Sequence, residues 1–126
     1  MKETELAQKF INSLSDIYDL YFEVGTMDIV GKQGNIVTAI EVKKQLNFKV
    51  IEQAYYNIPN ANYSYIAVPQ QYKQNNFAYT ICETFGIGVL LYNEDYDSVY
   101  ERIKPKLNRK QNPNEHLLQI RLGFHQ

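Results

Sequence analysis

The amino-acid sequence predicts a single α/β domain, residues 1–126, in which helices pack on a mixed β-sheet. Its length suits one compact domain with a real core. Segments rich in β-branched and aromatic residues alternate along the chain with segments whose apolar residues recur at helical spacing. Glycine, proline and asparagine separate these segments, as is typical of the turns between elements. We expect the element order α-β-β-β-α-β-α-β.

The first half of the chain predicts one helix followed by three strands. Apolar residues recur at helical spacing over residues 3–14. Three β-prone segments follow, at residues 17–24, 26–31 and 36–43. Between the second and third lies the turn signal Lys32-Gln33-Gly34-Asn35. These features predict an antiparallel meander.

The second half predicts alternating helices and strands. A helix that ends before Pro59 is indicated by an apolar stripe made of Val50, Ile51, Ala54, Tyr55 and Ile58. A strand over residues 63–68 follows. A further helix, ended by Gly86, is predicted to bury Phe77, Ala78, Ile81, Cys82 and Phe85. A strand over residues 87–92 completes the core, which spans residues 3–92.

Residues 93–126 form a C-terminal extension with two predicted features. A helix that Pro105 ends or kinks is indicated by the spacing of Tyr96, Val99, Tyr100 and Ile103. Residues 113–124 fit two interpretations. Asn112-Pro113 with Glu115 is typical of a helix start, whereas a strand is favoured by the alternation of Leu118, Ile120, Leu122 and Phe124.

The composition excludes several classes of protein. Cys82 is the only cysteine, which excludes an internal disulfide framework and a thiolate metal cluster. No stretch approaches the roughly 20 apolar residues of a membrane span, and the N-terminus lacks a secretory h-region. We therefore expect a cytoplasmic protein with no membrane contact. The net charge of −1 gives no global attraction to nucleic acid, so any such affinity must be local.

Three polar residues on neighbouring strands carry the chemical hypothesis. Side chains alternate faces along a strand, so Glu41 and Lys43 project to one side. The hairpin turn decides where Asp28 lies. If the turn is Gln33-Gly34, Asp28 is diagonal to Glu41, and if it is Gly34-Asn35, the two lie directly opposite. Either register gathers the three residues on one face, and only a one-residue bulge would separate them.

Two carboxylates brought this close repel each other, and a divalent cation would resolve the conflict. Mg²⁺ or Mn²⁺ suits such a site, because these hard ions accept carboxylates, a backbone carbonyl such as that of Val42, waters and phosphate oxygens. The bound ion would polarise a phosphate and activate a water, and Lys43 would position that water or help to deprotonate it. A simpler interpretation is that these are polar residues on an exposed sheet face.

With its surroundings, the pattern resembles the PD-(D/E)XK nuclease superfamily, which includes restriction endonucleases and Holliday-junction resolvases. Its signature is an acid near a strand start, an acid-x-lysine on the next strand, a preceding helix with a glutamate and a following helix. The corresponding pieces are Met27-Asp28-Ile29-Val30, Ile40-Glu41-Val42-Lys43, the helix with Glu3 and the helix with Gln53. Met27 stands where the superfamily's name has proline. The resemblance implies a restriction-endonuclease-like core, αβββαβ, extended by αβ.

The resemblance also implies a role for each residue. Asp28 and Glu41 become metal ligands and Lys43 the catalytic lysine, with a glutamate of the first helix as a further ligand. That glutamate is Glu3, which shares the apolar face of the helix, or Glu5, which points away from it; a first-turn acid that complements the helix dipole is an equal alternative. Gln53 would orient the substrate or the lysine, or is an ordinary solvated glutamine.

Basic residues near the site and in the extension are candidates for phosphate contact. They comprise Lys44, Lys49, Arg102, Lys104, Lys106, Arg109 and Lys110. A basic run of this kind is more often only a solvated surface.

The leading hypothesis is a small Mg²⁺-dependent DNA endonuclease of resolvase or restriction-like type, of the kind carried by phages and mobile elements. A resolvase would act as a homodimer. The alternative is a non-catalytic nucleic-acid- or protein-binding module that retains the nuclease fold. A third hypothesis, a regulatory protein with an accidental Glu-x-Lys, predicts that Asp28 and Glu41 lie far apart or on opposite faces.

Overall fold

A computed structural model describes residues 1–24, 27–73 and 75–108 of the chain. The elements follow the order expected from the sequence as far as the fifth strand, with bounds that differ by a few residues. They are α1 (Glu3–Leu14), β1 (Asp19–Val24), β2 (Met27–Gln33), β3 (Ile36–Val42), α2 (Phe48–Asn57), the 3₁₀ turn η1 (Ile58–Asn60), β4 (Tyr63–Pro69), α3 (Asn76–Phe85), β5 (Gly88–Asn93) and β6 (Ser98–Ile103).

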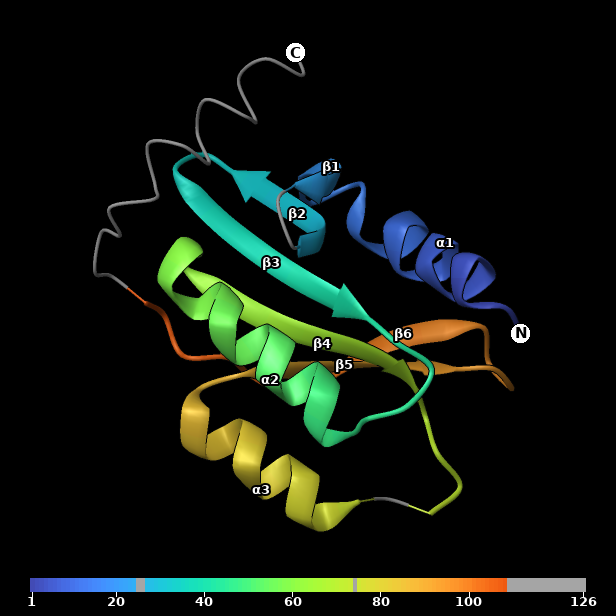
Figure 1. The fold of residues 1–126 in the computed structure, drawn as a ribbon. Coiled ribbons are helices and arrows are strands. Elements are labelled where there is room, and N and C mark those ends of the chain that lie inside the picture. The colour runs from blue at the N-terminus through green and yellow to red at the C-terminus, as the bar shows by residue number, and fades with distance from the viewer. Residues whose placement is uncertain (25–26, 74, 109–126) are drawn as a thin grey trace.

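The strands form one six-stranded mixed sheet in the order β1-β2-β3-β4-β5-β6. β1, β2 and β3 pair antiparallel as the predicted meander. β4 then lies parallel to β3, and β5 parallel to β4, because α2 and α3 carry the chain back between them (Figure 1). The C-terminal ends of β3, β4 and β5 therefore meet at one end of the sheet.

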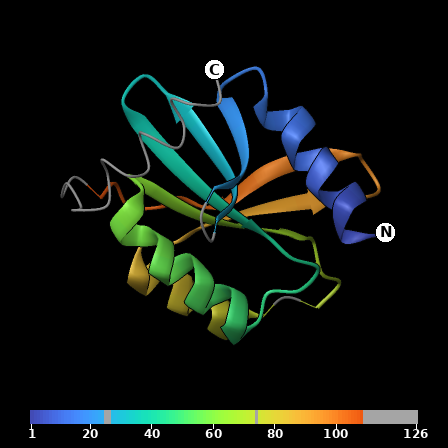
Figure 2. The ribbon, with the colours of Figure 1, turned by 45° about the horizontal axis from the view of Figure 1, so that its top comes forward.

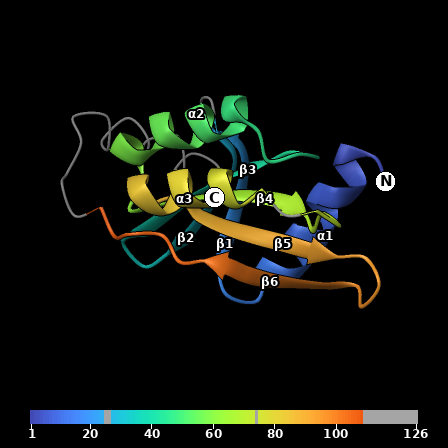
Figure 3. The ribbon, with the colours of Figure 1, turned by 90° about the horizontal axis from the view of Figure 1, so that it is seen from below.

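The helices cover both faces of the sheet. α2 and α3 lie on one face and α1 lies on the other (Figure 3). Ile40 and Val42 pack with Leu6 and Phe10 in the core under α1. Glu41 lies between Ile40 and Val42 on β3, so alternation turns it toward α2. Within the described residues, no helix has both the length and the apolar character to span a membrane.

The prediction of a helix between Tyr96 and Ile103 is wrong. The chain forms β6 over Ser98–Ile103 instead, antiparallel to β5. A tight turn after β5 redirects the chain. The side-chain oxygen of Asn93 accepts hydrogen bonds from two backbone N–H groups in the turn, and Asp97 adopts a positive φ of 46°. The helical spacing was coincidental, because on this edge strand only Ile103 is buried.

The helix faces also differ in part from those predicted. On α3, Ala78, Tyr79 and Cys82 are buried, whereas Phe77 and Phe85 are 66% and 49% exposed. The buried face therefore keeps Ala78 and Cys82 and is rotated toward Tyr79, by less than the roughly 100° that separates successive residues of a helix. On α2, Tyr55 is exposed and Asn57 is buried instead. Cys82 is buried as expected, and burial raises the pKa of its thiol to about 11.

Candidate active site

β2 and β3 separate at Asp28 and Glu41, and we call this point the carboxylate fork. The pairing of the two strands ends at Ile29 with Ile40, although β2 remains paired with β1. The next step of the same register aligns Asp28 with Glu41. There the Asp28 side chain replaces the main chain as a partner, and its Oδ2 accepts a hydrogen bond of 3.0 Å from the backbone N–H of Val42. The backbone of β3 thus holds the Asp28 carboxylate of β2 beside the Glu41 carboxylate of β3.

The turn between β2 and β3 sets this alignment. Gln33 pairs with Ile36, so the two loop residues are Gly34 and Asn35. Gly34 has a φ of 60°, which glycine adopts without strain at the first position of a two-residue hairpin turn. The pairing continues to the fork without a shift. Of the two registers left open by the sequence, the structure has the one that places the carboxylates directly opposite each other.

Glu41 is a buried carboxyl group with a perturbed pKa. It is only 2% exposed, and its Oε1 accepts a hydrogen bond of 2.8 Å from Nδ2 of Asn57, which is equally buried. The pKa of Glu41 is raised to about 7, mainly by burial and in smaller part by the neighbouring Asp28. The hydrogen bond from Asn57 and the positive charge of Lys43 act in the opposite direction. The two carboxyl groups therefore interact, which contradicts the third hypothesis.

Lys43 connects the end of β3 to the first helix. Lys43 is the first residue after β3, and its backbone N–H donates to the carbonyl of Ala67 on β4. Its Nζ lies 3.7 Å from Oε1 of Glu3, and both side chains are partly exposed. Figures 1 and 2 show the end of β3 close to the N-terminal turns of α1. Both first-helix acids are exposed, and Glu3 is the one that contacts the lysine.

Gln53 lies on the same side of α2 as Asn57, one turn nearer the start of the helix. Because α2 runs back along β3 (Figure 1), that turn lies toward the Lys43 end of the strand. The Oε1 atom of Gln53 is buried and has no hydrogen-bond partner in the described part of the chain. Such an acceptor is costly to leave unpaired, so this position suits a donor from a water, a lysine or a ligand.

Two of the basic candidates lie near the site. Lys44 and Lys49 are exposed in the connection from β3 to α2 and in the first turn of that helix. Arg109 and Lys110 lie outside the described residues.

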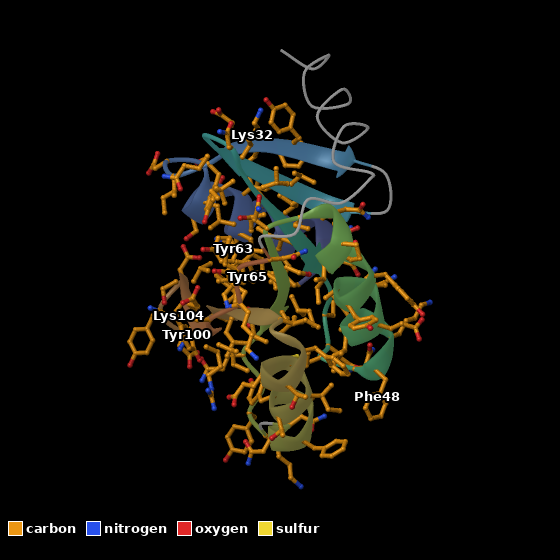
Figure 4. The ribbon with its side chains drawn as sticks, turned by 90° about the vertical axis from the view of Figure 1, so that its left-hand side faces the viewer. Lys32, Phe48, Tyr63, Tyr65, Tyr100 and Lys104 are labelled. Atoms are coloured by element: carbon orange, nitrogen blue, oxygen red, sulfur yellow. The ribbon has the colours of Figure 1, made fainter. Side chains whose placement is uncertain are left out.

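Three other basic candidates lie at the opposite end of the sheet. β6 runs antiparallel to β5, so the chain after it returns to the end where β3, β4 and β5 begin. There the N–H of Lys106 donates to the carbonyl of Gly86. Arg102 places its guanidinium 4.7 Å from the ring centre of Tyr79. Lys104 follows Ile103, which pairs with Val89 near the start of β5, and Figure 4 shows Lys104 well away from Phe48 at the start of α2. These residues are therefore not gathered at the carboxylate fork.

The residues at the fork fit a hard divalent cation. Asp28 and Glu41 offer carboxylate oxygens side by side, and burial of Glu41 without full charge compensation leaves it holding a proton near neutral pH. A cation would replace that proton. Within the described residues, no group of three or more His, Cys, Asp or Glu side chains is placed to hold a metal. Two carboxylates and a main-chain carbonyl are nevertheless typical of Mg²⁺, which keeps several of its waters.

Asn57 and Phe22 are site residues that the sequence analysis missed. Asn57 was visible only as a polar residue one turn after Gln53, at the margin of an apolar stripe. Its burial against Glu41 depends on how α2 sits on the sheet. Phe22 is 54% exposed on β1 and lies against the pocket that Asp28 lines. No local signal distinguishes it from the other aromatic residues of its strand.

The Asn57→Ala variant is expected to be about 1–3 kcal/mol less stable than the wild type at pH 8, because Glu41 loses its donor while charged. The loss should shrink at pH 5, where Glu41 holds a proton in the fold. Urea denaturation at both pH values measures it. Ser64→Ala is the matched control, because it removes another buried hydrogen bond between α2 and the sheet, from Ser64 Oγ to the carbonyl of Ala54. An equal pH dependence in both variants would contradict the prediction.

No protein-family model matches the chain, and no curated protein matches it in sequence. What the protein does must therefore be inferred from the site itself. The relevant features are two neighbouring carboxylates, one of them buried, and a lysine two residues beyond the buried one.

Proposed function

We propose that the protein is a cytoplasmic metal-dependent nuclease that hydrolyses DNA phosphodiester bonds, as an endonuclease of resolvase or restriction-like type. One observation carries the proposal. Asp28 and Glu41 lie opposite each other at the fork of β2 and β3, and Lys43 follows on the same strand beside Glu3. Two carboxylate groups and an ammonium group in one neighbourhood support a site that binds a cation and a phosphate.

The architecture supports the same proposal. The order α1-β1-β2-β3-α2-β4 matches the αβββαβ core implied by the resemblance to the PD-(D/E)XK superfamily. The acidic residue lies near the start of its strand and the acid-x-lysine at the end of the next. Glu3 lies on the preceding helix and Gln53 on the following one, as the resemblance implies.

Asp28, Glu41 and the carbonyl of Val42 would hold Mg²⁺ or Mn²⁺. When bound, the ion supplies Lewis-acid polarisation of the phosphate and a more acidic water. The fork prepares the residues for this role. The backbone N–H of Val42 fixes one oxygen of Asp28, and Asn57 fixes one oxygen of Glu41.

Lys43 is the group that acts on the nucleophile. Its ammonium lies within contact of Glu3, which holds it at the rim of the site, and its charge acts on Glu41. From there it can orient a water toward the phosphate and offset negative charge in the transition state. Gln53, with its unpaired buried oxygen, would orient the lysine or the water. Lys44 and Lys49 would contact neighbouring phosphates.

Two measurements on the wild-type protein test the function. Calorimetric titration with Mn²⁺ should show binding that is lost in Asp28→Asn, and incubation with Mg²⁺ should cut linear, branched or single-stranded DNA. Thr38→Val, on the opposite face of β3, is a control that leaves both carboxylates in place. Metal binding without cleavage of any substrate would favour the non-catalytic binding module. Absence of metal binding would overturn the proposal.

A further inference from the structure

A pocket of about 250 Å³ adjoins the carboxylate fork on the side of α1. Its lining includes Glu3, Asp28 and Val42, which also form the candidate site. The pocket and the candidate site thus share three residues. A group that entered this pocket would lie beside a phosphate bound at the fork, and would be the part of the substrate next to the bond that is cut.

The remaining walls of the pocket are mainly apolar. Ala7 and Ile11 contribute from α1, Phe22 from β1 and Ile29 from β2. The polar residues in the lining are Glu3, Thr4 and Asp28. The described residues that line the pocket include no lysine or arginine, so this space does not suit a phosphate. It suits an uncharged, flat group that carries hydrogen-bond donors.

Phe22 supplies an aromatic face to this pocket. It pairs with Ile29 in the β1–β2 ladder, yet 54% of its surface is exposed. Aromatic rings in exposed positions beside a nucleic-acid path serve as stacking platforms, because every nucleobase has a π-face. The ring thus lies against the same pocket as Asp28.

We propose that this pocket receives one unpaired nucleobase next to the scissile phosphate, with Phe22 stacking on it. The inference rests on the nuclease function proposed above and names its substrate class: DNA that is single-stranded, frayed or branched at the cut. The amino groups of the base would donate to the carboxylates of Glu3 and Asp28. A pocket of this volume is smaller than those of drug-sized ligands, as expected for one ring system rather than a whole nucleotide.

Intact duplex DNA would not fill the pocket. A paired base is stacked on both faces, and it must leave the helix before an aromatic side chain can cover one of them. Leaving the stack is least costly where the base has no partner. The proposed enzyme would therefore select its substrate by the absence of a base pair at the cutting position, which favours the resolvase-like form of the proposed function over the restriction-like form.

Binding experiments test the pocket separately from cleavage. Fluorescence anisotropy with a labelled oligodeoxyadenylate, in EDTA so that no cutting occurs, compares the wild type with Phe22→Ala, Phe22→Leu and Phe22→Trp. Phe48→Ala is the matched control, because Phe48 is a 68% exposed phenylalanine at the start of α2 (Figure 4). Phe22→Leu keeps an apolar side chain and removes only the ring, so it reports on stacking if the alanine variant folds poorly.

Phe22→Ala and Phe22→Leu are expected to lose about 10-fold or more in affinity for the single strand. Phe22→Trp and the control should bind it with near wild-type affinity. Affinity for a duplex should not depend on Phe22. Equal affinities in Phe22→Leu and Phe48→Ala, or no measurable single-strand binding, would overturn the pocket. Phe22-dependent binding by a protein that never cleaves DNA would leave the pocket standing and remove the nuclease. Cleavage together with single-strand binding that does not depend on Phe22 would support the nuclease and rule out the pocket.

Discussion

Replacing Glu41 with glutamine is expected to abolish metal-dependent cleavage and at the same time to stabilise the folded protein at pH 8. The variant removes a metal ligand and the buried charge together. The amide oxygen of the introduced glutamine can still accept from Asn57, and its amide nitrogen can donate to Asp28. We expect cleavage to fall by about 10²-fold or more, of the order seen when a single group of a catalytic site is removed.

The gain in stability follows from the pKa of Glu41. The folded protein binds its proton until about pH 7, whereas the unfolded chain releases it near the ordinary value of 4.5. Between these values the folded state holds more protons, so wild-type stability falls as the pH rises through the window and is level above it. The total loss is about 3 kcal/mol, from roughly 1.4 kcal/mol for each pKa unit.

Urea denaturation at pH 8 and pH 4.5 measures this effect. Glu41→Gln should exceed the wild type by up to about 3 kcal/mol at pH 8 and match it at pH 4.5. The matched control is Glu52→Gln, which removes the charge of an exposed glutamate on α2 and should alter neither stability nor cleavage. Adding Mn²⁺ at pH 8 should stabilise the wild type and not the Glu41 variant. A less stable Glu41→Gln protein at pH 8 would contradict the assignment of Glu41 as a strained, buried acid.

Replacing Lys43 with methionine is expected to reduce cleavage by about 10²- to 10⁴-fold and to leave metal affinity largely intact. Methionine keeps the apolar stem and removes the ammonium group that lies 3.7 Å from Glu3. Asp28 and Glu41 remain to bind the metal. A loss of activity with retained Mn²⁺ binding in calorimetry therefore separates the lysine's role from that of the carboxylates.

Two further variants define what Lys43 does. Lys43→Arg keeps the charge but cannot act as a base, because a guanidinium does not lose its proton. Substantial activity in this variant would mean that the lysine acts through its charge, and none would mean that it transfers a proton or needs the ammonium's geometry. Lys73→Met, at an exposed lysine before α3, is the control and should leave cleavage unchanged. A Lys43→Met protein as active as the control would remove the lysine from the mechanism.

The local sequence pattern predicted those elements whose structure depends mainly on residues close to them in the chain. In the meander, β2 and β3 flank a turn signal at Gly34-Asn35 and are strongly β-prone, so these two strands and their pairing follow from neighbouring residues. The Glu-x-Lys pair of β3 and its relation to Asp28 follow from the same turn. The β6 strand could not be predicted in this way, because its spacing is compatible with a helix and only its pairing with β5 decides.

That Asp28 and Glu41 share one face of the hairpin could be read from local residues alone, since either two-residue turn that the sequence allows gathers them there. The pairing of Gln33 with Ile36 in the folded sheet selects the register in which they lie directly opposite each other. The environment of the two carboxyl groups, in contrast, depends on the three-dimensional packing of the whole domain. Burial of Glu41 under α2, the hydrogen bond from Asn57, and the pocket between α1 and Phe22 all depend on how helices far along the chain dock on the sheet. Docking is set by the summed packing of many apolar side chains, and no short segment of sequence encodes it.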